Sequence, residues 1–380
     1  MGWGRRRWSW VGLVAVLGAL LLDGLHRNGA IGIDFHTYLA AARVGLQDGW
    51  SHIYDQSLVA AEQRRLASNL SAQPYLSPPP VAWLAALLAP LPFNAAFSVW
   101  AICVLALFAL AFTWASSAHG LNRWLAVAGA LSPWWVVRAI DLGQVVPLVA
   151  AGLLIAARFG RDRRDVAAGI ALTAILLKPN TAILVPVVLL AAGRHRMFVT
   201  WLAASTIVAL AALMVVGASG MSAYADQLLN SLPRGADYVT LHGAFGVTGW
   251  LLAALRGVIV LAVLVTAYRL RDDLRLVIAL GAVGALVVSP YLHASDLCVL
   301  TAAAFLVWES RETARWRVPI ALGWLAASPF LLLTPVGAQL NRWPLLELAL
   351  LLGLAATAWA SRVGLTFGDG RPHNQEARAT

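Results

Sequence analysis

NAAFSVWAICVLALFALAFTWASS, the sequence of residues 94–117, contains no charged side chain. A helix of roughly 20 apolar residues crosses the hydrocarbon core of a bilayer, which is ~30 Å thick. The segment is therefore long and apolar enough to span a membrane as one helix. It decides the class of fold, because segments of the same kind recur along the chain.

Apolar runs separated by short polar connections fill most of the 380 residues. The chain is 60% hydrophobic and 12% charged, and a soluble domain carries about twice that charged fraction. The sequence therefore predicts an all-α polytopic membrane protein. Besides 94–117, the runs lie at 8–25, 78–92, 121–138, 142–159, 165–178, 180–193, 197–217, 249–270, 274–291, 294–309, 317–334 and 343–361.

The run at 78–92 differs from the others because prolines mark both of its ends. Pro78, Pro79 and Pro80 open it, Pro90 and Pro92 close it, and it is shorter than a span requires. We expect a half-buried helix here, which leaves about twelve spanning helices.

The run at 8–25 follows Arg5, Arg6 and Arg7, as the apolar part of a secretory signal would. No small-residue cleavage pattern comes directly after Leu22, where Asp23 stands instead. We therefore expect an uncleaved first helix.

The basic residues indicate how the helices are oriented. With twelve crossings, most of the 28 lysines and arginines fall on one side, including RDRRD at 161–165 and RHR at 194–196, and the positive-inside rule assigns that side to the cytoplasm. Membrane orientation thus explains the net charge of +10 better than nucleic-acid binding does. We expect a plasma-membrane protein with one transmembrane domain at 1–361 and a cytoplasmic tail at 362–380.

Two long connections, 26–77 and 218–248, are expected on the outer face, the first of them with juxtamembrane helices. The polar motifs gather on the same face. Polar groups near hydrocarbon are costly unless they line a cavity or have a partner. Motifs that converge at one depth therefore predict a single site. They are GIDFHTYLAA (32–41), YLSPPP (75–80), RAIDLGQ (138–144), LLKPN (176–180) and SPYLHASD (289–296).

Asp34 opens a stretch with helical spacing and has two interpretations. Aspartate is a favoured helix N-cap, so the residue can serve the helix alone. A carboxylate at a helix start is also kept ionised by the helix dipole, while partial burial restores its basicity, which suits a general base. The sequence leaves both open.

Lys178 is the only lysine in the chain and lies in the apolar stretch ILLKPNTAIL (175–184). It can extend to the membrane interface at the end of a helix broken by Pro179. Arginine would do this equally well, whereas a compact ammonium group suits a phosphate oxygen in a tight pocket. The phosphate interpretation explains the lone lysine better.

Other polar residues of these motifs are further candidates. His293 and Asp296 follow a second helix break at Ser289 and Pro290, and His293 is either a satisfied polar residue or a phosphate ligand. Gln144 is suited to binding sugar hydroxyls. For Asp141 we expect an ion pair with Arg138, and Arg256 and Glu347 lie at a similar depth and are expected to pair within the membrane.

Disulfides and metal sites find little support in the sequence. Cys103 and Cys298 both lie in apolar runs, and Asp34 and His36 are two residues apart without a DxD or HxxxH pattern. We expect neither a cofactor nor a metal ion.

Taken in order, these motifs resemble those of glycosyltransferase family 87. The resemblance is carried by Asp-Phe-His-x-Tyr at 34–38, Tyr75 with the prolines at 78–80, Gly143-Gln144, Lys178-Pro179, and Ser289-Pro290 with His293 and Asp296. That family has the GT-C fold. It includes a mycobacterial polyprenol-phosphate-mannose-dependent α-(1,2)-mannosyltransferase of phosphatidylinositol mannoside synthesis.

The resemblance implies an inverting glycosyltransferase that acts on the periplasmic face. Its donor would be a polyprenyl-monophosphate sugar, with mannose expected, and its acceptor a glycolipid or glycan. By position, Asp34 corresponds to the base and His293 to a histidine near the donor phosphate. We assign the donor phosphate to Lys178, His293 and Arg138, and substrate contacts to His36, Tyr38, Tyr75, Gln144, Asn180 and Asp296. Ser77 and Val146 depart from the family pattern and leave the sugar and the acceptor open.

A transporter or flippase of lipid-linked sugars or another amphiphile is the alternative. Transport predicts polar groups near the bilayer midplane and often two similar halves. The gathering of polar motifs at one surface favours the enzyme.

Overall fold

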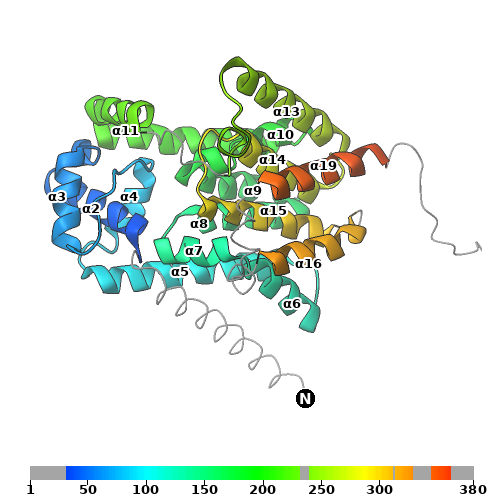
Figure 1. Ribbon diagram of the computed structural model, residues 1–380, viewed down its shortest axis with the longest axis horizontal. Helices are drawn as coiled ribbons and strands as arrows, with labels where there is room; N and C mark the ends of the chain where they lie inside the picture. Colours follow the sequence, from blue (N-terminus) through cyan, green and yellow to red (C-terminus); the bar gives the residue numbers. More distant parts are fainter. Residues whose placement is uncertain (1–30, 232–238, 311–312, 328–343, 361–380) are drawn as a thin grey trace, which may run out of the picture.

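The computed structural model describes residues 31–231, 239–310, 313–327 and 344–360. Within these ranges every regular element is an α-helix or a short 3-10 helix, so the predicted all-α class is confirmed (Figure 1). The expected first helix at 8–25 and the expected tail at 362–380 lie outside the described residues.

The helices fall into two groups. The first group, α2 (Ile33–Gln47), η1 (Trp50–His52), α3 (Gln56–Leu66) and α4 (Pro79–Ala86), lies at one end of the molecule (Figure 1). The larger group comprises α5 (Phe93–Ala115), α6 (Gly120–Leu131), α7 (Trp134–Leu142), α8 (Val146–Arg161), α9 (Asp165–Ala171), η2 (Leu172–Leu177), η3 (Pro179–Thr181), α10 (Leu184–Ala191), α11 (His195–Ser231), α12 (Leu241–Phe245), α13 (Gly249–Arg269), α14 (Leu274–Val288), η4 (Ala294–Leu297), α15 (Cys298–Glu309), η5 (Ala314–Trp316), α16 (Arg317–Ala326) and α19 (Pro344–Ala360).

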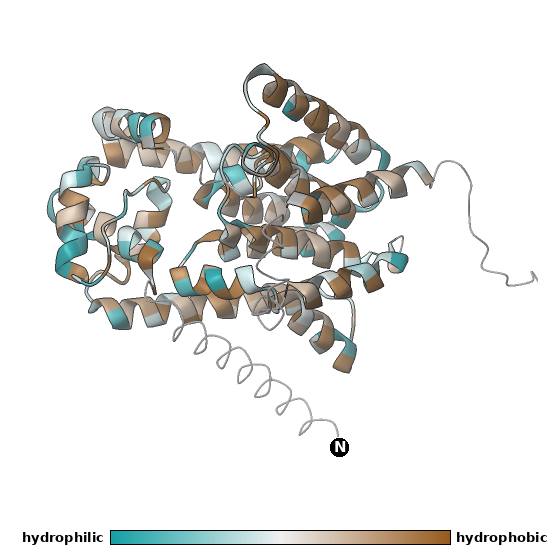
Figure 2. Cartoon of the chain, viewed as in Figure 1, coloured by the Kyte–Doolittle hydropathy of each residue, from teal (hydrophilic) through white to brown (hydrophobic). Residues whose placement is uncertain are grey.

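Each group has its own apolar core. One core joins α2, α4 and the first half of α5 around Phe35, Tyr54 and Tyr75, and the other is centred on α8, α14 and α15. In Figure 2 the helices of the larger group are mostly brown, whereas α3 is largely teal. The first group therefore combines a packed interior with a polar outer face, as expected of a connection outside the membrane.

Three of the described helices are long and apolar enough to cross a membrane, namely α5, α11 and α13. A fourth crossing arises if α6 and α7, which are bent by 66° at a break, count as one. The expected number of about twelve spans is not confirmed, because the structure divides several apolar runs into shorter helices. The runs at 165–178 and 180–193, for example, become α9, α10 and the two 3-10 helices between them.

The structure agrees with the prediction for 78–92 and differs from the prediction for 218–248. The short proline-flanked run at 78–92 contains α4, which begins at Pro79, ends at Ala86 and is followed by turns. The connection at 218–248 was expected to be a loop, but α11 continues through it to Ser231 after a single non-helical residue, Gly217. Its polar side chains lower the hydropathy, yet alanine, leucine, methionine and glutamine are good helix formers.

The junction between α7 and α8 fixes the first group onto the larger one. Gly143 ends α7 with a φ of 73°, and the amides of Gly143 and Gln144 donate to the carbonyls of Ile140 and Ala139, as in a Schellman motif. The Gly143 carbonyl accepts from Trp100 Nε1 at 2.9 Å. The amide of Gly32, just before α2, donates to the carbonyl of Asp141 at 2.6 Å. The start of α2 and the end of α7 are thus held together.

Substituting Gly143 tests this junction. A Cβ atom at Gly143 would lie 2.5 Å from Phe35 Cβ, and its φ is unfavourable for other residues. Gly120 is a matched control, because it also has a positive φ but nothing lies within 4 Å of its Cβ position. We expect Gly143→Ala to lower the free energy of unfolding more than Gly120→Ala, by the ~1–3 kcal/mol of an overpacked contact. Thermal unfolding in detergent measures the difference, and equal losses would contradict the close packing of α7 on α2.

Candidate functional site

A cavity of about 490 Å³ lies where the first group meets the helix ends of the larger one. This volume is within the ~300–1,000 Å³ typical of small-molecule sites. Six segments contribute to its wall: α2, the stretch 73–78, Gln144, the Lys178 region, α11, and the stretch 290–293. The lining residues are Asp34, Thr37, Tyr38, Gln73, Pro74, Leu76, Ser77, Pro78, Gln144, Leu177, Lys178, Pro179, Asn180, Tyr224, Leu228, Pro290, Tyr291 and His293.

Most of the site residues predicted from the sequence line this cavity. They are Asp34, Tyr38, Gln144, Lys178, Asn180 and His293. The remaining predicted residues, His36, Tyr75, Arg138 and Asp296, do not line it. The six lining residues come from four motifs that are far apart along the chain, and Leu76, Ser77 and Pro78 add the fifth motif, 75–80.

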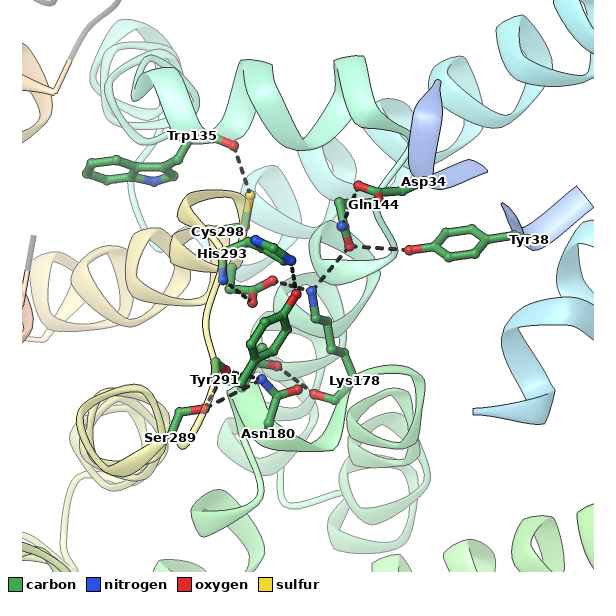
Figure 3. Close-up of polar contacts among 12 residues, drawn as sticks. Asp34, Tyr38, Trp135, Gln144, Lys178, Asn180, Ser289, Tyr291, His293 and Cys298 are labelled. Carbon is green, nitrogen blue, oxygen red and sulfur yellow. Dashed lines mark hydrogen bonds and ion pairs between the residues drawn. The ribbon is translucent and has the colours of Figure 1, made fainter. Parts of the chain in front are cut away.

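Gln144 links the carboxylate of Asp34 to the ammonium group of Lys178. Its Nε2 donates to Asp34 Oδ2 at 2.6 Å, and its Oε1 accepts from Lys178 Nζ at 3.4 Å and from the Tyr38 hydroxyl at 3.3 Å. Figure 3 shows these side chains pointing toward one another. Because Gln144 is buried and its backbone closes the Schellman motif of α7, its amide is fixed in place. Asp34 and Lys178 are therefore held on one wall by one side chain.

Lys178 forms an ion pair with Asp296. Nζ of Lys178 lies 2.6 Å from Oδ1 of Asp296, whose side chain is completely buried. The other carboxylate oxygen, Oδ2, accepts from the backbone amide of His293 at 2.9 Å, which closes a capping box at the start of η4. Asp296 thereby holds both the lysine and the backbone of the 293–296 turn.

The breaks in the helices at Pro179 and Pro290 bring the two segments of this ion pair together. Lys178 stands between η2 and η3, where Pro179 interrupts the apolar run. Asn180 Nδ2 donates to the carbonyl of Tyr291 at 2.7 Å, so the two breaks are joined directly. The Tyr291 hydroxyl contacts His293 Nε2, and both rings face the cavity (Figure 3). Burial lowers the pKa of His293, with opposing effects of Asp296, which raises it, and Lys178, which lowers it.

Asp34 lies in the first turn of α2 rather than at its cap. The N-cap is Gly32 in a left-handed conformation, and Asp34 is the second helical residue. Burial is the largest influence on its carboxyl group and raises its pKa from 3.8 to about 6, against the lowering effects of Lys178 and of the Gln144 hydrogen bond. Asp296 adds a further raising effect and Arg138 a further lowering one. At neutral pH the group is ionised but more basic than an ordinary aspartate.

The predicted residues outside the lining have other surroundings. His36 is fully buried, and its Nε2 lies 2.7 Å from the carbonyl of Gln63. The fully buried Tyr75 donates to the carbonyl of Pro78 and accepts from the amide of Ala82. Both residues support the wall from behind instead of facing the cavity, because α2 and the 75–80 stretch turn these side chains toward the core of the first group.

The two expected ion pairs are not formed in the part of the chain that the structure describes. Arg138 Nη1 and Asp141 Oδ1 are both buried without a hydrogen-bond partner, so Arg138 acts on Asp34 only through its charge. Arg256 donates to the carbonyl of Ser289 at 3.1 Å, and both carboxylate oxygens of Glu347 are buried without a partner. The prediction that Arg256 and Glu347 pair because of their similar depth is therefore wrong.

Sequence reasoning missed several lining residues, among them Gln73, Tyr224 and Tyr291. Tyr291 stands within SPYLHASD, two residues before His293, and an aromatic residue at a helix break was a usable signal. Tyr224 and Leu228 are four residues apart, which places them on one face of a helix. The interpretation of 218–248 as a loop concealed that spacing.

Metal ligands are not clustered in the described ranges, where no group of three or more His, Cys, Asp or Glu side chains is arranged to hold a metal ion. The charges at the cavity come from Asp34, Lys178 and Asp296, with Arg138 farther away.

Replacing Asp34 by asparagine tests the environment of its carboxyl group. Because folding raises the pKa from 3.8 to about 6, the stabilisation by Asp34 is complete below the lower value and is lost as the pH rises through the higher one. Asp34→Asn lacks this titration. Relative to wild type, we expect the variant to gain roughly 2 kcal/mol in stability between pH 4 and pH 8. Thermal unfolding at both pH values measures the gain, and parallel shifts of the two proteins would contradict the raised pKa.

The comparison with known families gives a clear match. The family model of glycosyltransferase family 87 matches residues 75–290, which is more than half of the chain. Gln144, Lys178 and Asn180 lie within the matched segment, whereas Asp34 and His293 lie outside it. No curated protein and no solved structure matches the chain. With its apolar helices and this match, the chain is a membrane protein that belongs to glycosyltransferase family 87.

Proposed function

We propose that this glycosyltransferase moves a sugar from a polyprenyl-monophosphate donor to a hydroxyl group of a glycolipid or glycan, with inversion at the anomeric carbon. Mannose is the sugar that the family resemblance suggests. The observation that carries the proposal is the wall on which the Gln144 amide joins the Asp34 carboxylate to the Lys178 ammonium group. Such a wall offers a base and a cation to one bound substrate.

Lys178 is the proposed partner of the donor phosphate. An ammonium group has three N–H donors, and two of them are directed to Asp296 and Gln144. The third remains for a phosphate oxygen. His293 and Asn180 line the cavity beside it, and the lowered pKa of His293 favours a neutral ring that can donate one hydrogen bond. Arg138, which does not line the cavity, would contribute only its charge.

Asp34 is the proposed general base. A base is most effective when its pKa is near the operating pH, and burial has raised the pKa of Asp34 to about 6. The Gln144 amide holds one carboxylate oxygen, Oδ2, and this bond orients the group. The other oxygen would accept the proton of the acceptor hydroxyl.

The reaction then proceeds in one displacement. The acceptor oxygen, losing its proton to Asp34, forms a bond to the anomeric carbon from the face opposite the phosphate. The bond between that carbon and the phosphate oxygen breaks, and polyprenyl monophosphate leaves with the electron pair. Phosphate is a good leaving group, so a second carboxylic acid such as glycoside hydrolases use is not required. Lys178 would stabilise the negative charge that develops on the phosphate.

The outer face of the plasma membrane is the proposed location of the reaction. Support comes from the positive-inside rule, which leaves the motifs of the cavity on the side opposite most arginines. The polar outer surface of α3 agrees with a position outside the hydrocarbon (Figure 2). Membership of a glycosyltransferase family favours transfer over the alternative of transport.

Purified protein in nanodiscs, supplied with radiolabelled polyprenyl-phosphate-mannose and a panel of glycolipid acceptors, tests the proposal. We expect wild type to form a new glycolipid and Asp34→Asn to lose about 10²- to 10⁴-fold in rate, the usual contribution of a general base. The rate of wild type should fall as the pH drops through about 6, where Asp34 takes up its proton.

Donor binding to Asp34→Asn serves as the control, because the variant keeps Lys178 and His293 and should retain wild-type affinity. Turnover at the wild-type rate by Asp34→Asn would exclude Asp34 as the base. Absence of product from every acceptor with wild type would count against the proposed donor.

A further inference from the structure

The second half of α11 forms an arm over the cavity. We define the arm as residues 218–231, which follow the break at Gly217 (φ 73°, ψ 169°). A Cβ atom at Gly217 would have nothing within 4 Å, so the glycine is required there by its backbone conformation and not by crowding. In Figure 1, α11 runs from the larger group of helices toward the first group. The break thus lets one helix serve both groups.

Close packing holds the arm against the first group. A Cβ atom at Gly220 would lie 2.8 Å from the carbonyl oxygen of Ser51, so the backbones of the arm and η1 nearly touch. The ring of Tyr224 stacks on that of Tyr54, with centroids 4.6 Å apart and planes at 27°. Tyr54 stacks in turn on Tyr75 at 5.4 Å. The position of Tyr224 is therefore fixed by a column of three rings.

Buried hydrogen bonds anchor the lower rings of this column. Tyr54 donates to the carbonyl of Ser77 at 2.8 Å, and Tyr75 donates to the carbonyl of Pro78 at 3.1 Å. Both of these tyrosines are almost completely buried, whereas Tyr224 is only partly buried and lines the cavity. The column accordingly presents one rigid aromatic ring to whatever enters.

The surroundings of Tyr224 have the chemistry of a carbohydrate site. Leu228, on the same face of the arm, and Leu76 supply apolar surface, and Gln73 and Ser77 supply an amide and a hydroxyl group. A sugar ring has C–H groups on its faces, which pack on aromatic rings, and hydroxyl groups at its edge, which need hydrogen-bond partners. These residues differ from the charged set around Lys178, which the proposed function assigns to the donor phosphate.

We propose that the arm and the stretch 73–77 form the acceptor subsite, and that the acceptor presents a sugar ring that packs on Tyr224. The inference rests on the proposed function, which supplies the idea of an acceptor. It assigns the acceptor to residues other than those proposed for the donor phosphate. The proposed function already has a glycolipid or glycan as the acceptor, and the inference assigns the residues that hold its sugar ring. The hydroxyl to be glycosylated would then lie in the same cavity as Asp34.

Binding of simple probes tests the subsite without relying on catalysis. Octyl α-mannopyranoside and octyl glucopyranoside carry a sugar ring and an apolar tail, and 1-octanol carries the tail alone. We expect wild type in nanodiscs to bind at least one glycoside more tightly than 1-octanol. Tyr224→Leu, which fills space without an aromatic ring, should weaken glycoside binding roughly 2- to 12-fold, as the loss of an aromatic contact predicts.

Two control variants separate ring stacking from damage to the arm. Tyr224→Phe keeps the ring and should bind as wild type does. Leu229→Ala alters an exposed neighbour on the same arm and should also leave binding unchanged. Unfolding temperatures near that of wild type for all three variants establish that the fold is intact.

The proposal is overturned if wild type binds neither glycoside better than 1-octanol, or if Tyr224→Leu binds the glycosides as wild type does. Equal weakening by Leu229→Ala would also overturn it. The affinity for polyprenyl-phosphate-mannose is measured in parallel and should not change in Tyr224→Leu. If wild type does not transfer sugar from polyprenyl-phosphate-mannose, the proposed reaction is rejected. The glycoside-binding results would still test the subsite at Tyr224.

Discussion

Two carboxylates share one ammonium group at the wall of the cavity. Asp296 is completely buried and lies 2.6 Å from Lys178, and a buried charge without a partner would destabilise the fold by several kcal/mol. Lys178 is therefore held by Asp296, and Asp34 reaches the lysine only through the Gln144 amide. Burial makes Asp34 basic, and the lowering effects of Lys178 and the Gln144 hydrogen bond do not cancel the effect of burial, so the pKa of Asp34 stays at about 6. In the proposed function, the donor phosphate would depend on the same lysine.

Backbone irregularities make this arrangement possible. Gln144 follows the left-handed Gly143 at the end of α7, and Lys178 precedes Pro179 at the end of η2. His293 is the N-cap of η4, three residues after Pro290. The breaks let these three segments converge on one cavity. Hydrogen bonds such as that from Asn180 to the carbonyl of Tyr291 satisfy backbone groups that the breaks expose.

The sequence predicted the helical class, the short helix after the prolines and six of the residues that line the cavity, because each depends on a local signal. Hydropathy indicates helices, prolines mark their ends, and a single lysine among arginines indicates a special environment.

The number of spans was not obtained, because a long apolar run does not reveal where it breaks into shorter helices. His36 and Tyr75 show a second limit: neighbouring residues of one motif point in different directions, and only the packing of α2 and α4 decides which of them face the cavity. The prediction of a loop at 218–231 is wrong, because polar residues there lower the hydropathy of a helix that continues to Ser231.

The link between Asp34 and Lys178 through Gln144 is the central claim, and the pH dependence of kcat/KM in Gln144→Leu tests it most directly. The Gln144 hydrogen bond lowers the pKa of Asp34, so its loss should move the acidic limb of the profile to higher pH than in wild type. Gln73→Leu is a matched control, because Gln73 lines the same cavity and its side-chain amide donates to Ser71 rather than to Asp34. Its acidic limb should coincide with that of wild type. An acidic limb that stays at the wild-type position in Gln144→Leu would contradict the account.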